Sequence, residues 1–276
     1  MPADLLLRCT TTLALALSLF TAACASRSPV SPVAARPQLL LLGEVHDNPD
    51  GHRARYELLQ AVVREGWRPA LVMEQFDREQ QPLLDQAQRD CKTADCLIAL
   101  AGKSSWDWPL YRPLLQLALD HQLPLIAANV SRAEAGKATR DGLEALFEAD
   151  TVARLHLAEP LPADIEAEQL HSIIEGHCNM LPEATARTMI RAQVARDVAM
   201  AMALQDGLAR QGGAVLIAGN GHVRRDVGVR RWLPTALAQA TQTQGFLESG
   251  DALEAYDVVH VLVPHQRPDP CAAFGK

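Results

Sequence analysis

Two places in the sequence put an imidazole three residues after a glycine that ends an apolar run. Gly43 is followed by Glu44 and His46, and Gly219 is followed by His222. A glycine lets the backbone turn where a side chain would hinder it, and Glu44 and His46 point the same way if the chain stays extended. Two imidazoles with one or two carboxylates are the ingredients of a divalent metal site that keeps positions open for water.

Glu74 follows another apolar run and completes the candidate set. The sequence therefore predicts a metal site formed by Glu44, His46, Glu74 and His222. The alternative is a buried hydrogen-bond network of the same residues that holds one edge of a sheet together. Other catalytic arrangements are poorly represented, because the chain has no Gly-x-Ser-x-Gly elbow and no Gly-x-Gly-x-x-Gly after the first apolar run.

These residues need a scaffold that brings separate strand ends together. From residue 38 onward, short apolar runs alternate with helix-length segments, which is typical of a parallel sheet covered by helices on both faces. The carboxyl ends of parallel strands lie on one edge of the sheet, where ligands bind. The expected strands are residues 39–44, 69–76, 124–131, 213–222 and 257–263, with residues 245–248 as a short edge strand.

Residues 131–208 are rich in Ala, Glu and Met and contain no clear strand. The section is too long for a single crossover. We therefore expect a helical subdomain inserted into an α/β domain that consists of residues 38–130 and 209–276. The predicted fold class is α/β, with a parallel sheet flanked by helices.

The N-terminus has the pattern of an export signal. A basic residue, a short apolar stretch and small residues indicate a signal peptide over residues 1–23. The sequence "TAAC" resembles a bacterial lipoprotein signal, in which Cys24 becomes the lipidated first residue; the alternative is a secreted protein cut near Ala23. Residues 24–37 would then comprise the lipidated Cys and a Pro-rich tether. By the same resemblance, Ala25 favours the outer membrane.

The remaining cysteines agree with export. Cys91, Cys96, Cys178 and Cys271 are an even set in a chain that carries a signal peptide. Cys91 and Cys96 are close enough to clip one loop, which leaves Cys178 to pair with Cys271 and tie down the C-terminal tail. The alternative, a metal-thiolate site, matches no two-residue zinc knuckle.

Charge and composition exclude two classes of partner. The formal net charge is -7, and 48% of the residues are apolar, enough for a large core. The chain has no long run of Lys and Arg. This argues against a nucleic-acid surface and against a polybasic membrane patch.

An aromatic segment, "WDWPLY", stands out in a chain with few aromatic residues. It places Trp106, Trp108 and Tyr111 within six residues, just before a helix. Such a segment can present a flat apolar face with one phenol to a planar ligand or a partner subunit. The alternative is that these rings seal a helix against the sheet.

Several motifs occur together in an order that resembles a known family. They are "LLGEVHDNP", "PALVMEQFDREQQ", "WDWPLYRPLL", "AANVSRAEA", "RAQVARD" and "IAGNGHVRRDVGV". With the lipoprotein-like signal, this set resembles the ChaN family of iron-regulated, haem-binding bacterial lipoproteins. That family is related to the Tiki metalloproteases and TraB-type proteins, which also carry paired Gly-x-x-His motifs.

The ChaN resemblance implies a homodimer that encloses two stacked haems. A Tyr from one subunit would ligate the iron, and a His and a Lys from the other would hold the propionates. A phenolate is a reasonable axial ligand for ferric haem. Among Tyr56, Tyr111 and Tyr256, the aromatic segment favours Tyr111, and Lys137 and His177 are the candidates for the propionates.

The resemblance therefore implies a haem-binding, lipid-anchored envelope protein that serves haem and iron uptake, with an outer-membrane haem receptor as a further partner. The Tiki-like relation implies an alternative, a hydrolase in which a divalent ion held by the strand-end residues activates water. A third interpretation is an envelope interaction module without a ligand.

Overall fold

The computed structural model describes residues 37–248 and 252–273, and these residues contain a six-stranded sheet in the order β3-β2-β4-β1-β5-β6. All strand pairs are parallel, which confirms the predicted fold class. The signal peptide, Cys24 and nearly all of the tether fall outside the described residues. The strands are β1 (Leu39–Glu44), β2 (Ala70–Asp77), β3 (Leu125–Asn129), β4 (Ala214–Gly219), β5 (Thr241–Leu247) and β6 (Val258–Val261).

The leucine run of β1 supplies both faces of the sheet. Successive side chains of a strand point to opposite faces, so Leu40 and Leu42 join one hydrophobic core while Leu39 and Leu41 join the other. None of these four leucines is more than 4% exposed. An unbroken apolar strand of this kind belongs in the middle of a parallel sheet covered on both sides, and β1 lies between β4 and β5.

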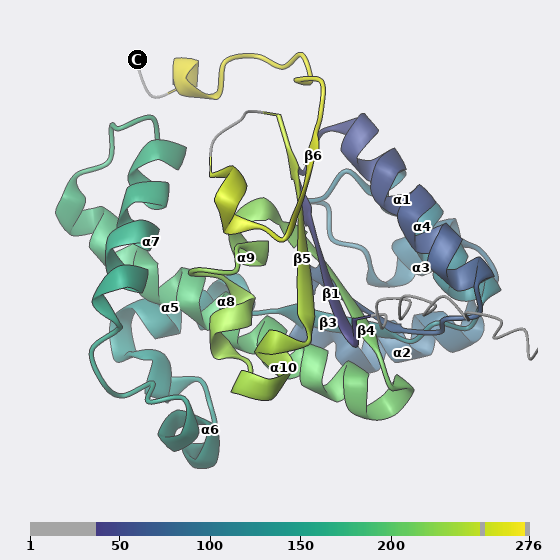
Figure 1. Cartoon of the computed structure of the whole chain (residues 1–276), viewed down its shortest axis with the longest axis horizontal. Coiled ribbons are helices and arrows are strands. Elements are labelled where there is room, and N and C mark those ends of the chain that lie inside the picture. The colour runs from purple at the N-terminus through teal and green to yellow at the C-terminus, as the bar shows by residue number, and fades with distance from the viewer. Residues whose placement is uncertain (1–36, 249–251, 274–276) are drawn as a thin grey trace, which may run out of the picture. The chain divides into compact units, whose positions relative to one another are not determined.

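The two cores are covered by different helices (Figure 1). One face packs against α1 (Pro49–Arg64), α2 (Gln81–Asp90), α3 (Ala94–Ala101) and α4 (Trp108–Asp120). The other packs against α5 (Arg132–Asp141), α6 (Ala149–Arg154), α7 (Ala163–Gly176) and α8 (Glu183–Gln211). Two short helices, α9 (Asn220–Val223) and α10 (Thr235–Gln239), follow β4.

Residues 130–213 contain α5 to α8 and no strand, as the sequence predicts for the inserted section. The longest helix, α8, lies close to the sheet because Gly207 has no side chain: a Cβ there would lie 3.0 Å from the Cβ of Ala70. The helix ends at Gly212, whose φ of 70° is the left-handed conformation that glycine adopts easily. The inserted helices share one hydrophobic core with the sheet, and their treatment as a separate subdomain stays a prediction.

The prediction of a short edge strand at residues 245–248 is wrong. β5 starts at Thr241 and pairs with β1 on one side and β6 on the other, so β6 is the edge. The first half of β5 is polar, so the sequence pattern does not indicate a strand there. Thr243 is buried but donates its backbone N–H and its hydroxyl to Asp257, at 2.8 and 3.1 Å, which satisfies its polar groups inside the sheet.

Two disulfides confirm the predicted cysteine pairs. Cys91–Cys96 closes the turn between α2 and α3, and Cys178–Cys271 ties the C-terminal tail to the turn between α7 and α8. Among the described residues, no helix is both long enough and apolar enough to cross a membrane.

Candidate functional site

The end of β1 carries a buried carboxylate with an unusual number of partners. Oε1 of Glu44 accepts hydrogen bonds from the Tyr111 hydroxyl at 2.5 Å, from Nδ1 of His46 at 2.7 Å and from Nε2 of Gln75 at 3.1 Å. Its other oxygen is bonded by Arg55. Burial alone would raise the pKa of Glu44, but the Arg55 charge and the His46 hydrogen bond outweigh it and hold that pKa well below its usual range. Glu44 is therefore an ionised carboxylate.

The helix that supplies Arg55 starts at a well-formed cap. The side chain of Asn48 accepts a hydrogen bond from the N–H of Gly51 at 2.9 Å, and Pro49 occupies the first turn. Arg55 follows one and a half turns later on the buried face of α1 and is fully buried. The sequence gives no direct sign of this partner, because Arg55 stands among exposed charged residues of an amphipathic helix.

His46 is the most accessible member of the group, with 48% of its side chain exposed. Burial lowers its pKa, but the hydrogen bond to Glu44 and the charges of Glu74 and Glu44 outweigh this and raise the pKa. The imidazole also meets the edge of Trp106, with 5.1 Å between ring centroids. Because Nδ1 bonds an ionised carboxylate, it carries the proton, so in the neutral imidazole Nε2 is the acceptor.

His222 has a second carboxylate partner, which the sequence did not reveal. Its Nδ1 lies 2.6 Å from Oδ1 of Asp197, a fully buried residue of α8. Burial raises the pKa of Asp197, and the adjacent carboxylate raises the pKa of His222 despite the burial of the imidazole. Asp197 belongs to "RAQVARD", but in the sequence it is one charged residue in a long helix, and only its burial marks it.

Glu74 lies between the two imidazoles. Its Oε2 accepts a hydrogen bond from the N–H of Gly219 at 2.8 Å, and its Oε1 is 3.8 Å from Nε2 of His222. A Cβ on Gly219 would lie 3.1 Å from Nε2 of His46 and 3.7 Å from Oε2 of Glu74. The four predicted residues Glu44, His46, Glu74 and His222 are thus brought together at one edge of the sheet.

The two Gly-x-x-His motifs pack closely against each other at their glycines. A Cβ on Gly43 would overlap Oδ1 of Asn220, whereas a Cβ on Gly219 would press on the ring of His46. Each glycine therefore leaves room for a residue of the other motif. Asn220 in turn exchanges hydrogen bonds with the backbone of Phe246, at 2.6 and 3.0 Å, which joins the end of β4 to β5.

The geometry has one feature of a metal centre, imidazoles oriented by carboxylates, and lacks another, three or more ligands placed around one point. Both imidazoles bond a carboxylate through Nδ1, which is how second-shell groups orient metal ligands. Within residues 37–248 and 252–273, however, no group of three or more His, Cys, Asp or Glu side chains is placed to hold a metal ion. The metal site formed by Glu44, His46, Glu74 and His222 therefore stays a prediction.

Tyr111, the predicted iron ligand, is fully buried in the core on the α1–α4 face. Its ring contacts His52 and Trp108 edge-on, with centroid distances of 4.6 and 5.9 Å. Burial and the Glu44 carboxylate raise its pKa far above the usual range, so the phenol keeps its proton. The rings of Trp108 and Tyr111 therefore pack α4 against the sheet, whereas Trp106 is only partly buried.

The other two tyrosines also have partners. The Tyr56 hydroxyl accepts a hydrogen bond from Gln60 at 2.6 Å. The Tyr256 hydroxyl donates to the carbonyl of Asn220 at 3.1 Å, and burial raises the pKa of Tyr256 to about 12.

Lys137 and His177, the predicted propionate partners, lie in the inserted section and not at the strand-end cluster of Glu44, His46, Glu74 and His222. Lys137 is exposed on α5 and donates to the carbonyl of Ala145 at 2.6 Å. His177 follows α7, with Nδ1 2.7 Å from the carbonyl of Ile173. The structure therefore does not bring these two residues near Tyr111, and their role stays a prediction.

One of the similar known structures supports the fold. The chain is similar to a structure described as cofacial haem binding to ChaN of Campylobacter jejuni, with 19% identity, a TM-score of 0.64, and coverage of 81% of this chain and 87% of that one. A mutant of erythromycin esterase EreC in its open conformation matches with 12% identity, a TM-score of 0.45, and coverage of 86% of this chain and 79% of that one.

No curated protein matches the chain by sequence. A family model does match, over residues 32–233, and its description is haem-binding uptake, Tiki superfamily, ChaN. This segment is more than half of the chain and includes both Gly-x-x-His motifs and the aromatic segment. The chain therefore belongs to the ChaN family of haem-binding uptake proteins in the Tiki superfamily.

Proposed function

We propose that this protein is a haem-binding lipoprotein of the bacterial cell envelope that serves haem and iron uptake. The observation that carries the proposal is membership of a family described as haem-binding uptake proteins. The similar Campylobacter jejuni protein binds haem cofacially, which supports a haem held between two subunits here. The two disulfides suit an oxidising compartment.

The finer parts of the proposal come from the sequence. Lipidation of Cys24 would anchor the protein, Ala25 favours the outer membrane, and an outer-membrane haem receptor is the expected partner. Lys137 is exposed on α5 and could meet a haem carried by a second subunit. Tyr111 fits the role of iron ligand poorly, because its oxygen is buried and bonded to Glu44.

The proposal is tested by titrating the protein from residue 38 onward with haemin, since the described residues from 37 onward form one compact unit. The absorbance spectrum and the mass of the complex are followed together. Saturable uptake with a shifted Soret band, accompanied by a change from monomer to dimer, is the expected result. Non-saturable uptake, with the spectrum of free haemin, would reject the haem-binding function.

A second candidate function, metal-dependent hydrolysis, is favoured by the matched carboxylate–imidazole pairs Glu44–His46 and Asp197–His222 on either side of Glu74. A bound divalent ion would supply activated water at neutral pH. The test is metal analysis after dialysis against Zn²⁺ or Mn²⁺. A stoichiometric ion that is lost in His46→Ala/His222→Ala but kept in His171→Ala, an exposed His of α7, would support this function. An equal ion content in the wild-type protein, the double variant and His171→Ala would reject this function.

A further inference from the structure

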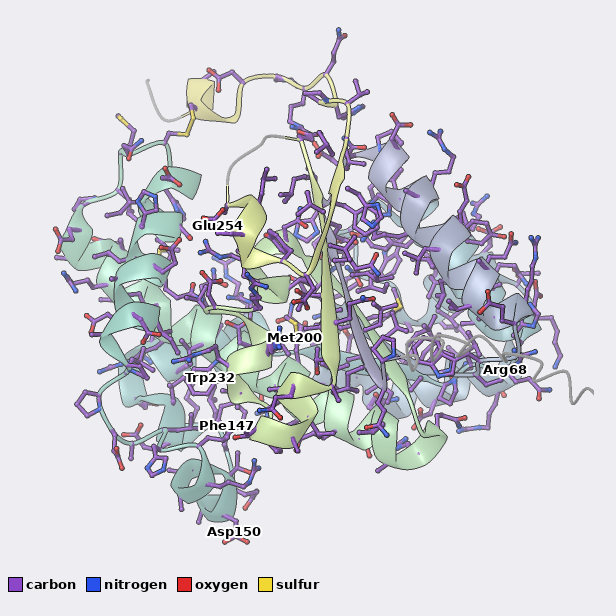
Figure 2. All side chains as sticks on the ribbon, in the orientation of Figure 1. Arg68, Phe147, Asp150, Met200, Trp232 and Glu254 are labelled. Atoms are coloured by element: carbon purple, nitrogen blue, oxygen red, sulfur yellow. A yellow bond between two sulfur atoms is a disulfide. The ribbon has the colours of Figure 1, made fainter. Side chains whose placement is uncertain are left out.

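The C-terminal tail, residues 262–273, crosses the edge of the sheet at which the strands end (Figure 1). It leaves β6 and finishes at the turn between α7 and α8, where the disulfide Cys178–Cys271 fixes it (Figure 2). Within these residues, a short helical turn at Pro270–Ala273 is the only regular element. The tail therefore connects the two sets of helices that cover opposite faces of the sheet.

The first part of the tail is anchored to the start of α1. The side-chain amide of Asn48 donates to the carbonyl of Val263 at 3.0 Å. A Cβ on Gly51 would lie 2.8 Å from Cδ1 of Leu262, so Leu262 can pack on the first turn of α1 because Gly51 has no side chain. The tail therefore begins next to the loop that carries His46.

Arg267 forms the middle anchor of the tail. Its guanidinium donates to Asp47 at 2.7 and 2.8 Å and to both carboxylate oxygens of Glu248 at 2.7 Å. Asp47 directly follows His46, and Glu248 directly follows β5. The N–H of His265 also donates to Glu248, at 2.9 Å. One arginine of the tail therefore joins the loops after two neighbouring strands, β1 and β5.

The tail has no apolar anchor beyond Leu262. Residues 263–269 are all exposed, and Val263 is 73% exposed. Hydrophobic burial therefore does not hold this segment in place. Ordering an exposed segment costs conformational entropy, which partly exposed ion pairs offset only in part. The disulfide to Cys178 is thus the strongest contact that keeps the tail over the sheet edge.

This disulfide is the more accessible of the two. Cys271 is exposed and Cys178 is partly exposed, whereas Cys91 is 2% exposed and Cys96 is partly exposed. Thiol–disulfide exchange starts with the attack of a thiolate on a disulfide sulfur, so its rate depends on access to that sulfur. A reductant should therefore break Cys178–Cys271 before it breaks Cys91–Cys96.

We propose that the tail is a redox-sensitive strap, in which reduction of Cys178–Cys271 releases residues 263–273 and frees the loop that carries His46. The reductant is a dithiol. One of its thiolates attacks Sγ of Cys271, and Cys178 leaves as a thiolate that takes up a proton. The second thiol of the dithiol then attacks the mixed disulfide and releases Cys271. The protein gains two electrons and two protons, and the dithiol becomes a disulfide.

Release of the strap changes access to the strand-end cluster. In the oxidised protein, Asp47 is bonded to Arg267, and Asn48 is bonded to the tail and to Glu248. Once the tail leaves, the loop after β1 loses its contacts with the tail, and the imidazole of His46, already 48% exposed, becomes open to larger molecules. This inference goes beyond haem binding and does not depend on whether the strand-end cluster binds a metal ion.

The first experiment measures hydrogen exchange of the wild-type protein before and after reduction with dithiothreitol, at short labelling times. Alkylation and mass spectrometry identify the cysteines that are reduced. In the reduced protein, residues 263–273 should exchange at least about tenfold faster, and the amides of Asp47 and Asn48 should also exchange faster. The strands β1 and β4 should stay protected, because only the tail is released.

The second measurement is the rate at which diethyl pyrocarbonate modifies His46, read by peptide mass spectrometry. Reduction should raise this rate at least about threefold, because the loop then opens locally. His156 is the internal control: it is 70% exposed and lies in the turn between α6 and α7, so it should react equally in both states.

Paired cysteine variants assign the response to one disulfide. Without reductant, Cys178→Ser/Cys271→Ser should show the fast tail exchange and the fast His46 modification of the reduced wild-type protein. Cys91→Ser/Cys96→Ser is the control. It should keep the tail protected until dithiothreitol is added and should then respond as the wild-type protein does.

A further variant tests the middle anchor while the disulfide stays intact. Arg267→Ala should raise the rate of His46 modification, because Asp47 loses its partner, while Cys178–Cys271 still forms. Arg210→Ala, which removes an exposed arginine of α8, is the control and should behave as the wild-type protein.

The proposal is overturned by any of three results. If reduction of Cys178–Cys271 leaves the exchange of the tail unchanged, other contacts hold the tail. If the tail is released but His46 reacts at the same rate, the tail does not control access to the strand-end cluster. If β1 and β4 lose protection together with the tail, the disulfide stabilises the whole fold and not a movable segment.

Discussion

The hydroxyl of Tyr111 lies 2.5 Å from Oε1 of Glu44, so a residue of α4 closes the end of β1. The same carboxylate is bonded by Arg55 of α1 and by His46 of the following loop. The carboxylate of Glu44 therefore connects β1 with both α1 and α4. Tyr111 therefore has a structural role that is independent of any ligand.

Tyr111→Phe is expected to lower the free energy of unfolding by about 1–3 kcal/mol, because it removes a hydrogen bond to a buried charged group and keeps the ring packing. Urea unfolding followed by circular dichroism measures the change. Tyr56→Phe is the control, since the Tyr56 hydroxyl is only partly buried and bonds one glutamine. Equal free energies of unfolding of the two variants would contradict a stabilising role for the hydrogen bond to Glu44.

Arg55→Met is expected to lower the free energy of unfolding by about 3–5 kcal/mol, because it leaves the buried Glu44 without its positive partner. Arg55 is fully buried, and Met keeps most of its apolar volume. The matched control is Arg53→Met on the same helix, whose ion pair with Asp50 is exposed and should change stability by less than about 1 kcal/mol. A loss in Arg55→Met as small as that of the control would contradict the prediction.

The two disulfides should differ in their contribution to stability. Cys178–Cys271 spans 93 residues and Cys91–Cys96 spans 5. In the chain-entropy account, the long loop stabilises the protein by about 4–5 kcal/mol and the short loop by about 2 kcal/mol. Urea unfolding of the paired Cys→Ser variants measures both values. A larger loss for Cys91→Ser/Cys96→Ser would contradict this order.

Acid should release the C-terminal tail. Hydrogen bonds from Arg267, of 2.7 Å each, lower the pKa of Glu248 from 4.5 to about 2 despite some burial, with a further hydrogen bond from Asn48. A carboxyl group whose pKa is lowered on folding stabilises the protein above its unfolded pKa. This contribution is therefore present above pH 4.5 and is lost as the pH falls toward 2.

Hydrogen exchange of residues 262–273 between pH 6 and pH 3, corrected for the intrinsic exchange rate, measures the release. Protection of the tail should fall with pH in the wild-type protein. In Glu248→Gln the protection of the tail should be weak at every pH, because the neutral amide cannot titrate and cannot form an ion pair with Arg267. Glu57→Gln, on the exposed face of α1, is the control and should follow the wild-type protein. A pH dependence that persists in Glu248→Gln would assign the release to another group.

The sequence by itself determined the parallel α/β fold class, the edge at which the polar residues meet, and the cysteine pairs. These depend on local patterns: an apolar run such as Leu39–Leu42 can only be buried, and the residue that follows each parallel strand must lie at the common edge. The proximity of His46, Glu74 and His222 was predictable for this reason. The family resemblance added haem as the expected ligand, which the residue pattern alone did not indicate.

Only the tertiary structure decided which polar groups are paired and which are open. Tyr111 is fully buried, whereas the side chain of His46 is 48% exposed. Asp197 bonds His222, 25 residues away in the chain, and Thr243 bonds Asp257, which lies just before β6. Burial and pairing depend on residues that are distant in the chain. A local sequence pattern carries no information about these residues. The free energy of a buried polar side chain is determined by the hydrogen-bond partners that the folded core places around it.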